Sequence, residues 1–327
     1  MLAQLIGHSA TAGLFNAIGA GPARPVLAKL GGVQDRELPL FSRHSFQQLV
    51  HDPTRNVAQA RHGHVHGEVL LWPDTFTNFF HPHVGLAATE VLERAGWRVR
   101  VPTGPVCCGL TWISTGQLKT ARRVLERTAA ELAAHVERGG LVVGLEPSCL
   151  AVFRSDAPEL LPHNETIERL ARQSFTLAEL LSAHTPGFSA PRLARAPDMA
   201  TNGRRPASRA ETLLGASAPA VRALVQTHCH QHAVLGFEAD RALLEAMGLD
   251  VERLNSGCCG LAGNFGFEPG HLAGSKAAGE RVLFPAVREA ARDAVRKGRS
   301  CASRRRRSPC PCHRARSPRV SRRVPAP

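Results

Sequence analysis

Cys107-Cys108-Gly109-Leu110 occurs a second time in the chain, as Cys258-Cys259-Gly260-Leu261. A lone cysteine follows each copy, Cys149 in the first case and Cys301 in the second, and the two spacings differ by a single residue. Each lone cysteine also comes directly after a serine. Adjacent cysteine pairs are uncommon by chance, so two of them with matched downstream spacing indicate a duplicated module.

The residues around each copy alternate between short apolar runs and longer stretches with helical periodicity. This alternation predicts parallel sheets covered by helices on both faces. Both Cys-Cys-Gly loops follow a predicted strand, at the carboxyl end where such sheets usually bind ligands. The sequence therefore predicts an α/β fold of two similar modules, each with a short parallel sheet flanked by helices. The predicted strands span residues 69–73, 97–101, 141–145, 223–226 and 250–254, and the predicted helices span residues 84–95, 115–138, 238–247 and 275–295.

The chain divides into five predicted segments. The two modules are separated by a stretch rich in Pro, Ala, Ser and Arg without sustained periodicity, which is typical of a linker or surface insertion. The last segment is rich in Arg, Pro and Ser and cannot build an apolar core. In chain order, the segments are a helical leader (1–66), the first module (67–184), the linker or insertion (185–219), the second module (220–301) and a disordered basic tail (302–327).

The formal net charge of +14 is concentrated at one end of the chain. Residues 296–327 hold 12 Lys and Arg and no Asp or Glu, so the rest of the chain is nearly balanced. A charge block confined to one end is usually a tail, and we expect no specific nucleic-acid binding. No run is apolar enough for a membrane span, and no secretory signal opens the chain. We therefore expect a cytoplasmic protein, or one peripheral to the inner face of the membrane.

The cysteines gather in two sets, one in each predicted module. Thiolates are soft ligands, and cysteines from separate loops are how proteins surround an iron–sulfur core. Cys310 and Cys312, in the tail, are expected to be incidental. The predicted metal ligands are Cys107, Cys108 and Cys149 in the first module, and Cys229, Cys258, Cys259 and Cys301 in the second.

Several neighbours of these cysteines are candidate site residues. Asp74 stands at the end of the first predicted strand, where the second module has Cys229, so the two sites are not expected to be equivalent. His228 and His230 flank Cys229 and are candidates to tune or ligate the metal. On an extended segment these two histidines would share a face, and Cys229 would point the other way. The glycines after the cysteine pairs, Gly109 and Gly260, would let the backbone approach a cofactor or take a positive φ.

Other interpretations of the paired cysteines remain open. A structural zinc site uses the same ligands, and a thiol redox pair is a second alternative, although neither module has the Cys-x-x-Cys of thioredoxin-like proteins. Core packing is a third. No Gly-x-Gly-x-x-Gly follows a predicted strand, so we do not expect the chain to bind a dinucleotide by itself.

Taken together, the motifs resemble the cysteine-rich CCG domain pair. More narrowly, they are similar to the carboxyl-terminal iron–sulfur part of FAD-linked oxidases of the D-lactate, glycolate and D-2-hydroxyglutarate dehydrogenase type, and to the glycolate oxidase iron–sulfur subunit. The resemblance covers about residues 66–295. The stretches that carry it are residues 72–78 (WPDTFTN), 106–109 (VCCG), 146–149 (EPSC), 227–232 (THCHQH) and 257–267 (GCCGLAGNFGF).

The resemblance implies electron transfer through an iron–sulfur cluster, of the 4Fe-4S type, with FAD only on a partner domain or chain. The family pattern is a Cys, then Cys-Cys-Gly, then Cys-x-x-Cys. Asp74 and Glu146 stand where the first module would have a family cysteine, and Gly298 does so in the second. The electron acceptor is not implied by any residue here. The chain would be an oxidoreductase component that is inactive without its flavoprotein partner.

The chain also departs from the family pattern. It has neither the flavin domain nor the ferredoxin segment of larger members, and Cys301 matches by spacing but lacks the apolar strand that should precede it. A truncated gene product with an incomplete second site is therefore one hypothesis. The leading hypothesis is an iron–sulfur electron-transfer module of a flavin-dependent 2-hydroxy-acid dehydrogenase. The alternatives are a cluster-based disulfide reductase subunit and a non-catalytic zinc-binding scaffold.

Overall fold

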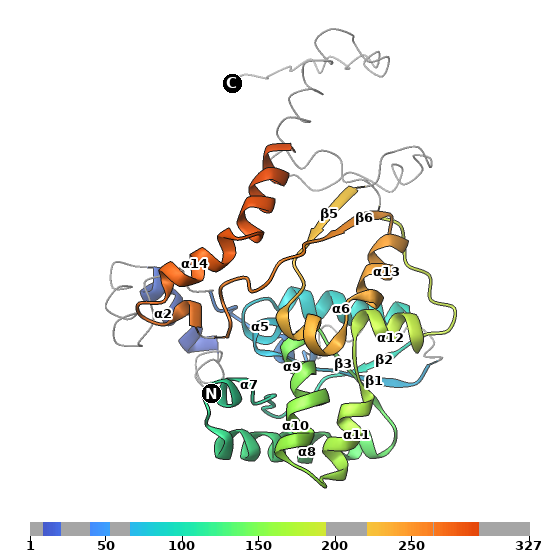
Figure 1. Cartoon of the computed structure of the whole chain (residues 1–327). Helices are drawn as coiled ribbons and strands as arrows, with labels where there is room; N and C mark the ends of the chain where they lie inside the picture. Colours follow the sequence, from blue (N-terminus) through green and yellow to red (C-terminus); the bar gives the residue numbers. More distant parts are fainter. Residues whose placement is uncertain (1–8, 21–39, 53–65, 194–220, 264, 294–327) are drawn as a thin grey trace, which may run out of the picture.

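The computed structural model describes residues 9–20, 40–52, 66–193, 221–263 and 265–293. Within these ranges the chain has the predicted α/β architecture, with short parallel sheets flanked by helices (Figure 1). Cys301, the predicted tail and most of the predicted linker lie outside the described residues, as does much of the predicted leader.

The first sheet has four parallel strands in the order β2-β1-β3-β4. Three of them were predicted from apolar runs, and their observed bounds differ from the predicted ones by a few residues. The fourth, β4, was not predicted, because Ser-Phe-Thr carries no apolar run and its strand geometry comes from pairing with β3. The strands are β1 (Glu68–Leu71), β2 (Arg98–Arg100), β3 (Leu141–Gly144) and β4 (Ser174–Thr176).

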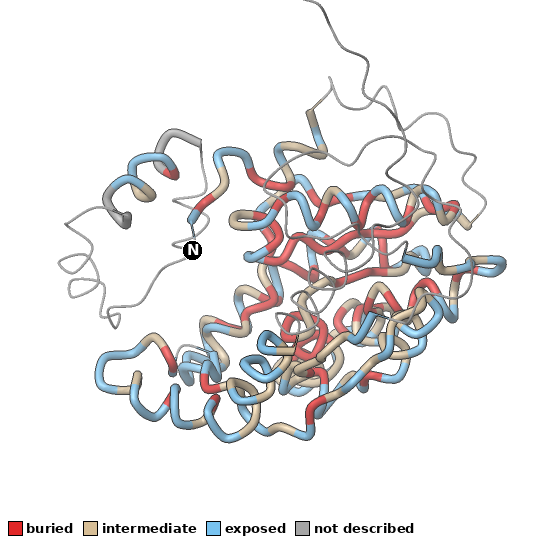
Figure 2. Tube along the Cα trace, turned by 90° about the horizontal axis from the view of Figure 1, so that it is seen from above, coloured by how far each residue is buried: buried red, intermediate tan, exposed pale blue. Residues whose placement is uncertain are grey.

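Helices cover both faces of the first sheet, because successive side chains of a strand point to opposite faces. Leu70 packs into one apolar cluster with Leu125 and Leu132 of α8 (Leu118–Glu137). Val69 and Leu71 pack into the other, with side chains from α6 (Pro82–Arg94) and α12 (Leu177–Ala183). Figure 2 shows that the buried residues are concentrated along the extended segments at the centre of the molecule, with helical turns around them that alternate between buried and exposed. This double layer holds the carboxyl ends of the strands in fixed positions.

The second sheet has two parallel strands, β5 (Val221–Val225) and β6 (Leu249–Arg253), with α13 (Glu238–Ala246) between them in the chain. Helix α13 packs against α12, so the second sheet is joined to the helical layer of the first. The predicted helix 275–295 is interrupted: α14 (Leu272–Glu280) ends before a turn at residues 281–282, and residues 283–293 form a further helical stretch.

Short helices follow several strands and carry most of the candidate site. Residues 152–156 and 231–235 are π-helical, which the sequence did not predict, and such turns often occur at functional sites. None of the helices in the described part of the chain has the length and apolar character needed to cross a membrane. The remaining helices are α2 (Ser9–Ala20), α4 (Phe46–Val50), α5 (Thr75–Phe79), α7 (Leu110–Ser114), α9 (Pro147–Ala151), η2 (Val152–Asp156), α10 (Ala157–Leu160), α11 (Glu165–Gln173), η3 (Gln231–Leu235) and η4 (Phe265–Phe267).

Candidate metal centre

Three cysteines meet at the carboxyl end of the first sheet. Cys107 and Cys108 follow β2, and Cys149 lies on α9, which follows β3. Cys108 and Cys149 are both buried, and their sulfur atoms are 3.1 Å apart. Cys107 is half-buried, and all three cysteines are free thiols. The fold therefore brings together the three sulfur ligands that the sequence predicted for the first module.

Helix α8 holds the backbone of the first cysteine loop in place. The hydroxyl of Thr128 donates a hydrogen bond to the carbonyl oxygen of Cys107 at 2.9 Å, and the Cys107 amide donates to the same hydroxyl at 3.3 Å. Thr128 is itself buried in the middle of the helix. The sequence did not identify this residue, because its contact with Cys107 depends on the packing of the helix over the loop.

The two Cys-Cys-Gly loops adopt the same local turn. Gly109 has a φ of 83° and donates its amide to Cys107 Sγ at 3.4 Å, and Gly260 has a φ of 93° and donates to Cys258 Sγ at 3.2 Å. These left-handed conformations favour glycine. Amide hydrogen bonds to a sulfur ligand are among the features that set the potential of an iron–sulfur site. The shared turn supports the duplicated chemistry suggested by the repeat.

We expect Gly260→Ala to destabilise the protein more than Gly270→Ala does. Both glycines have a positive φ, so both substitutions incur left-handed strain of about 1–2 kcal/mol. A Cβ at Gly260 would lie 2.0 Å from the carbonyl oxygen of Ser275, whereas one at Gly270 would meet no atom within 4 Å. Overpacking of this kind typically adds about 1–3 kcal/mol. Urea unfolding of the two variants checks this, and equal losses would contradict the close approach.

The Cys107 and Cys108 thiols both have a raised pKa, which favours their protonated forms when no cation balances the charge. The interaction with Cys108 raises the pKa of Cys107 well above its usual value, and burial raises it further. For Cys108, the contact with Cys107 lowers the pKa, but the contact with Cys149 and complete burial outweigh it and raise the pKa. Neighbouring buried thiolates repel one another, so a cationic centre is what would let these sulfurs ionise together.

Two carboxylates accompany the sulfurs. Asp74 is buried at the start of α5, where Oδ1 accepts hydrogen bonds from the amides of Phe76 and Thr77 at 2.9 Å. Its other oxygen, Oδ2, is buried and has no hydrogen-bond partner among the described residues. Burial raises the pKa of Asp74, the bonds with Thr77 lower it, and the charge of Glu146 raises it. Asp74 thus presents a free oxygen at the position where the second module has Cys229.

Glu146 caps α9 and connects it to the second sheet. Its Oε1 accepts hydrogen bonds from the amide and the hydroxyl of Ser148, at 3.1 and 2.6 Å. Ser148 Oγ in turn lies 3.3 Å from Nε2 of His228, in the loop after β5. The sequence did not mark Ser148 as a site residue, although a serine precedes each lone cysteine. This contact joins the two halves of the candidate site.

His228, Cys229 and His230 form a compact group beside this contact. One ring nitrogen of each histidine and the Cys229 sulfur all lie within 4.8 Å of one another. The segment is not extended, because residues 229–230 begin a helical turn, and so Cys229 does not point away from the histidines. Burial lowers the pKa of His228, the charge of Glu146 raises it, and the neighbouring His230 lowers it.

The second cysteine loop, residues 255–261, is more open than the first. Cys258 is exposed and Cys259 is half-buried. Residues 255–258 border a cavity of about 180 Å³, together with residues 278 and 281–283. Among the described residues, the only three ligand-bearing side chains that all lie within 4.8 Å of one another are His228, Cys229 and His230. The sulfurs of Cys229, Cys258 and Cys259 therefore do not all lie within 4.8 Å of one another, and the same holds for the three sulfurs of the first module.

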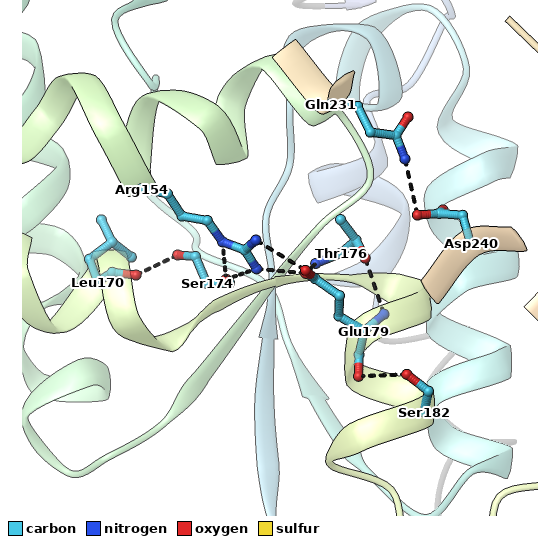
Figure 3. A network of polar contacts seen from close by, with 8 residues as sticks. All are labelled: Arg154, Leu170, Ser174, Thr176, Glu179, Ser182, Gln231 and Asp240. Atoms are coloured by element: carbon cyan, nitrogen blue, oxygen red, sulfur yellow. Dashed lines mark hydrogen bonds and ion pairs between the residues drawn. The ribbon is translucent and has the colours of Figure 1, made fainter. Parts of the chain in front are cut away.

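Figure 3 shows two neighbouring sets of polar contacts, one that joins η2 to β4 and α12 and one that joins η3 to α13. Arg154 of η2 donates to both carboxylate oxygens of Glu179, at 3.1 and 2.6 Å, and to the carbonyl oxygen of Ser174. Gln231 of η3 donates to Asp240 of α13 at 3.0 Å. Burial raises the pKa of Asp240, and the charge of Glu179 raises it further. The surroundings of Asp240 therefore disfavour its ionised form, and its side-chain hydrogen bond comes from the neutral amide of Gln231.

We expect Asp240→Asn to raise the free energy of unfolding at pH 7. Because the pKa of Asp240 is raised in the folded state, its contribution to stability is fully present below the ordinary value of 3.8 and is lost as the pH rises through the folded-state pKa. An asparagine keeps an oxygen for Gln231 without the charge. Urea unfolding between pH 4 and pH 8 checks this, and a variant that loses stability as steeply as the wild type with rising pH would contradict it.

Comparison with known proteins finds a family model that matches the region of the first cysteine site. Residues 74–154 match the family model described as the CCG cysteine-rich domain, which begins at Asp74 and includes Cys107, Cys108 and Cys149. This part of the chain is similar to the CCG cysteine-rich domain. The match confirms the resemblance inferred from the sequence, and the matched residues include the three cysteines at the end of the first sheet.

Named relatives extend the match beyond the CCG domain. Lactate utilization protein A of Geobacillus thermodenitrificans is 28% identical over 217 residues, which cover 63% of this chain and 77% of that protein. A subunit of the anaerobic glycerol-3-phosphate dehydrogenase of Escherichia coli K12 is 25% identical over 263 residues, or 80% of this chain and 58% of that protein. A subunit of the fumarate reductase (CoM/CoB) of Methanothermobacter marburgensis is 27% identical over 127 residues, which cover 37% of this chain and 25% of that protein.

These relatives include named subunits of a dehydrogenase and of a reductase, so the chain is related to components of oxidoreductase systems. The chain spans less than two thirds of the dehydrogenase subunit. No solved structure matches the chain.

Proposed function

We propose that the protein is an iron–sulfur electron-transfer module of a flavin-dependent 2-hydroxy-acid dehydrogenase, which passes electrons from a partner flavin to an acceptor. The observation that carries the proposal is the buried sulfur pair of Cys108 and Cys149, with Cys107 beside it, in a CCG domain. Relatives named for lactate utilization and for a dehydrogenase support the redox setting. The proposed modules are residues 67–184 and 220–301.

The donor set of the first site fits an iron–sulfur cluster. Its three sulfurs do not all lie within 4.8 Å of one another, although Cys108 and Cys149 are in contact. Ligands of a single tetrahedral zinc ion would be about 3–4 Å apart, whereas ligands bound to different irons of a cluster are spaced more widely. Asp74 Oδ2, in the same matched region of the chain, is a buried oxygen with no hydrogen-bond partner among the described residues. When bound, the cluster would supply one-electron chemistry.

The protein residues around this site have three roles in the proposal. Cys107, Cys108 and Cys149 would hold the cluster, and Asp74 is the candidate for a fourth, oxygen ligand. The packed helices exclude water, and the Gly109 amide on Cys107 Sγ stabilises charge on the sulfur. Electron transfer needs no proton-abstracting base, so none is assigned. In the second module the cluster ligands predicted from the sequence are Cys229, Cys258, Cys259 and Cys301, the last of which lies outside the described residues.

In this proposal FAD is bound by a partner chain. The protein itself would lie in the cytoplasm, or at the inner face of the membrane. The 2-hydroxy acid would bind to that partner and would not touch this chain. The protein alone should therefore show no turnover with D-lactate or glycolate, but it should accept electrons from a reduced flavin.

The test is the iron, acid-labile sulfide and zinc content of the full chain purified without oxygen, with visible absorption and electron paramagnetic resonance spectra before and after dithionite. Iron with equimolar sulfide and a band that bleaches on reduction is the expected result. Absence of both iron and sulfide, under conditions that load other iron–sulfur proteins, would overturn the proposal. Zinc without iron would favour the scaffold alternative.

A further inference from the structure

The group formed by His228, Cys229 and His230 calls for an explanation of its own. The first-site sulfurs lie in the region that matches the CCG domain, and Cys229 forms no set of three ligand atoms within 4.8 Å with the described residues of the second cysteine loop. Two imidazoles and a thiol within 4.8 Å of one another are the ligands that zinc prefers, at a spacing that one ion can close by small side-chain movements.

A second observation is an unpartnered ring nitrogen in this group, which indicates a binding partner for it. Nδ1 of His230 is buried and has no hydrogen-bond partner among the described residues. Buried polar atoms in folded proteins are nearly always satisfied, and an unsatisfied one calls for an unseen ion or water. An imidazole nitrogen with a free lone pair would be satisfied by binding a metal ion.

We propose that His228, Cys229 and His230 bind a single zinc ion, separate from the iron–sulfur site of the CCG domain. Cys229 loses its thiol proton to solvent on binding, because only the thiolate is a ligand. Cys229 is exposed, so the fourth position is open to water. This proposal removes Cys229 from the cluster ligands predicted from the sequence, and it does not depend on the proposed electron-transfer function.

The position of the ion explains what it would do. His228 lies 3.3 Å from Ser148, which adjoins Cys149, and η3 packs against α9. The zinc ion would therefore sit where the loop after β5 meets the CCG domain and would hold the two parts together. We expect chelation of zinc to lower the melting temperature while leaving the iron in place.

The test compares three variants of the full chain, each purified without oxygen and analysed for zinc, iron and acid-labile sulfide. His230→Ala should reduce zinc from about one ion per chain to near zero and leave iron unchanged. Cys108→Ser should reduce the iron and sulfide content and leave the zinc content unchanged. His83→Ala is the matched control. The rings of His81 and His83 also form a close pair, with 5.7 Å between their centroids, but neither residue belongs to the group of His228, Cys229 and His230. This control should change neither metal.

The outcomes separate this proposal from the proposed function. If His230→Ala loses iron and sulfide, the group belongs to the cluster and the zinc proposal is wrong. Zinc in the wild type without any iron would support the zinc site and refute the electron-transfer module. Should His230→Ala fail to fold, titration of the zinc-free wild type with Co²⁺ replaces it. We expect one equivalent of Co²⁺ to bind per chain and to give a thiolate-to-cobalt charge-transfer band. Binding of Co²⁺ without that band would overturn the proposal.

Discussion

Replacing Cys108 with serine should remove most of the bound iron and acid-labile sulfide. The Cys108 sulfur is buried and lies 3.1 Å from that of Cys149, so no other side chain can take its place without moving the loop. A hydroxyl is a harder and far less acidic ligand than a thiol and binds iron–sulfur cores weakly. We expect at least about a tenfold loss of iron relative to the wild type.

The matched control is Cys310→Ser, in the carboxyl-terminal segment outside the described residues. The sequence predicts that this cysteine is incidental, so iron content should be unchanged. Cys149→Ser should lose as much iron as Cys108→Ser, and the double variant little more, because residues that act as one unit are not additive. Full retention of iron and sulfide in Cys108→Ser would remove this cysteine from the ligand set and with it the main support for the proposed function.

Replacing Phe153 with alanine should lower the free energy of unfolding by about 3–5 kcal/mol, which is typical of a large buried aromatic. Phe153 is fully buried in η2, directly after the helix that carries Cys149. Its ring meets that of Trp72, at the end of β1, edge to face with 4.8 Å between centroids. The substitution leaves a cavity between two elements whose ends carry site residues.

Urea unfolding measures this effect, with Phe76→Ala as the matched control. Phe76 is 56% exposed, so its removal should change stability by no more than about 0.5 kcal/mol, as is usual for surface substitutions. A loss below about 1 kcal/mol for Phe153→Ala would mean that the core around Trp72 collapses into the cavity. Iron content of Phe153→Ala should also fall, because α9 loses its packing support.

Part of the fold could be predicted from local patterns. The apolar runs before Asp74 and after residue 140 predicted β1 and β3, and the periodicity of residues 115–138 predicted α8. These elements are specified by their own side chains. Strand β4 and the π-helical turns η2 and η3 could not be predicted in this way, because pairing with β3 and packing against neighbouring helices determine them.

The candidate site shows the same division. Cys107, Cys108 and Cys149 were identified from their repeat and spacing, and the fold brings them to one end of the sheet. Thr128 and Ser148 were missed, since each acts through a contact with a residue far away in the chain.

The sequence by itself determined the α/β class and the resemblance to the CCG cysteine-rich domain, because short-range patterns and spacings carry that information. Only the tertiary structure decided which side chains share a site. It brought Cys149 into contact with Cys108, Thr128 onto the backbone of Cys107, and Ser148 next to His228. The physical reason is that distances of a few ångströms between side chains depend on how whole helices and sheets pack, and no local pattern specifies that packing.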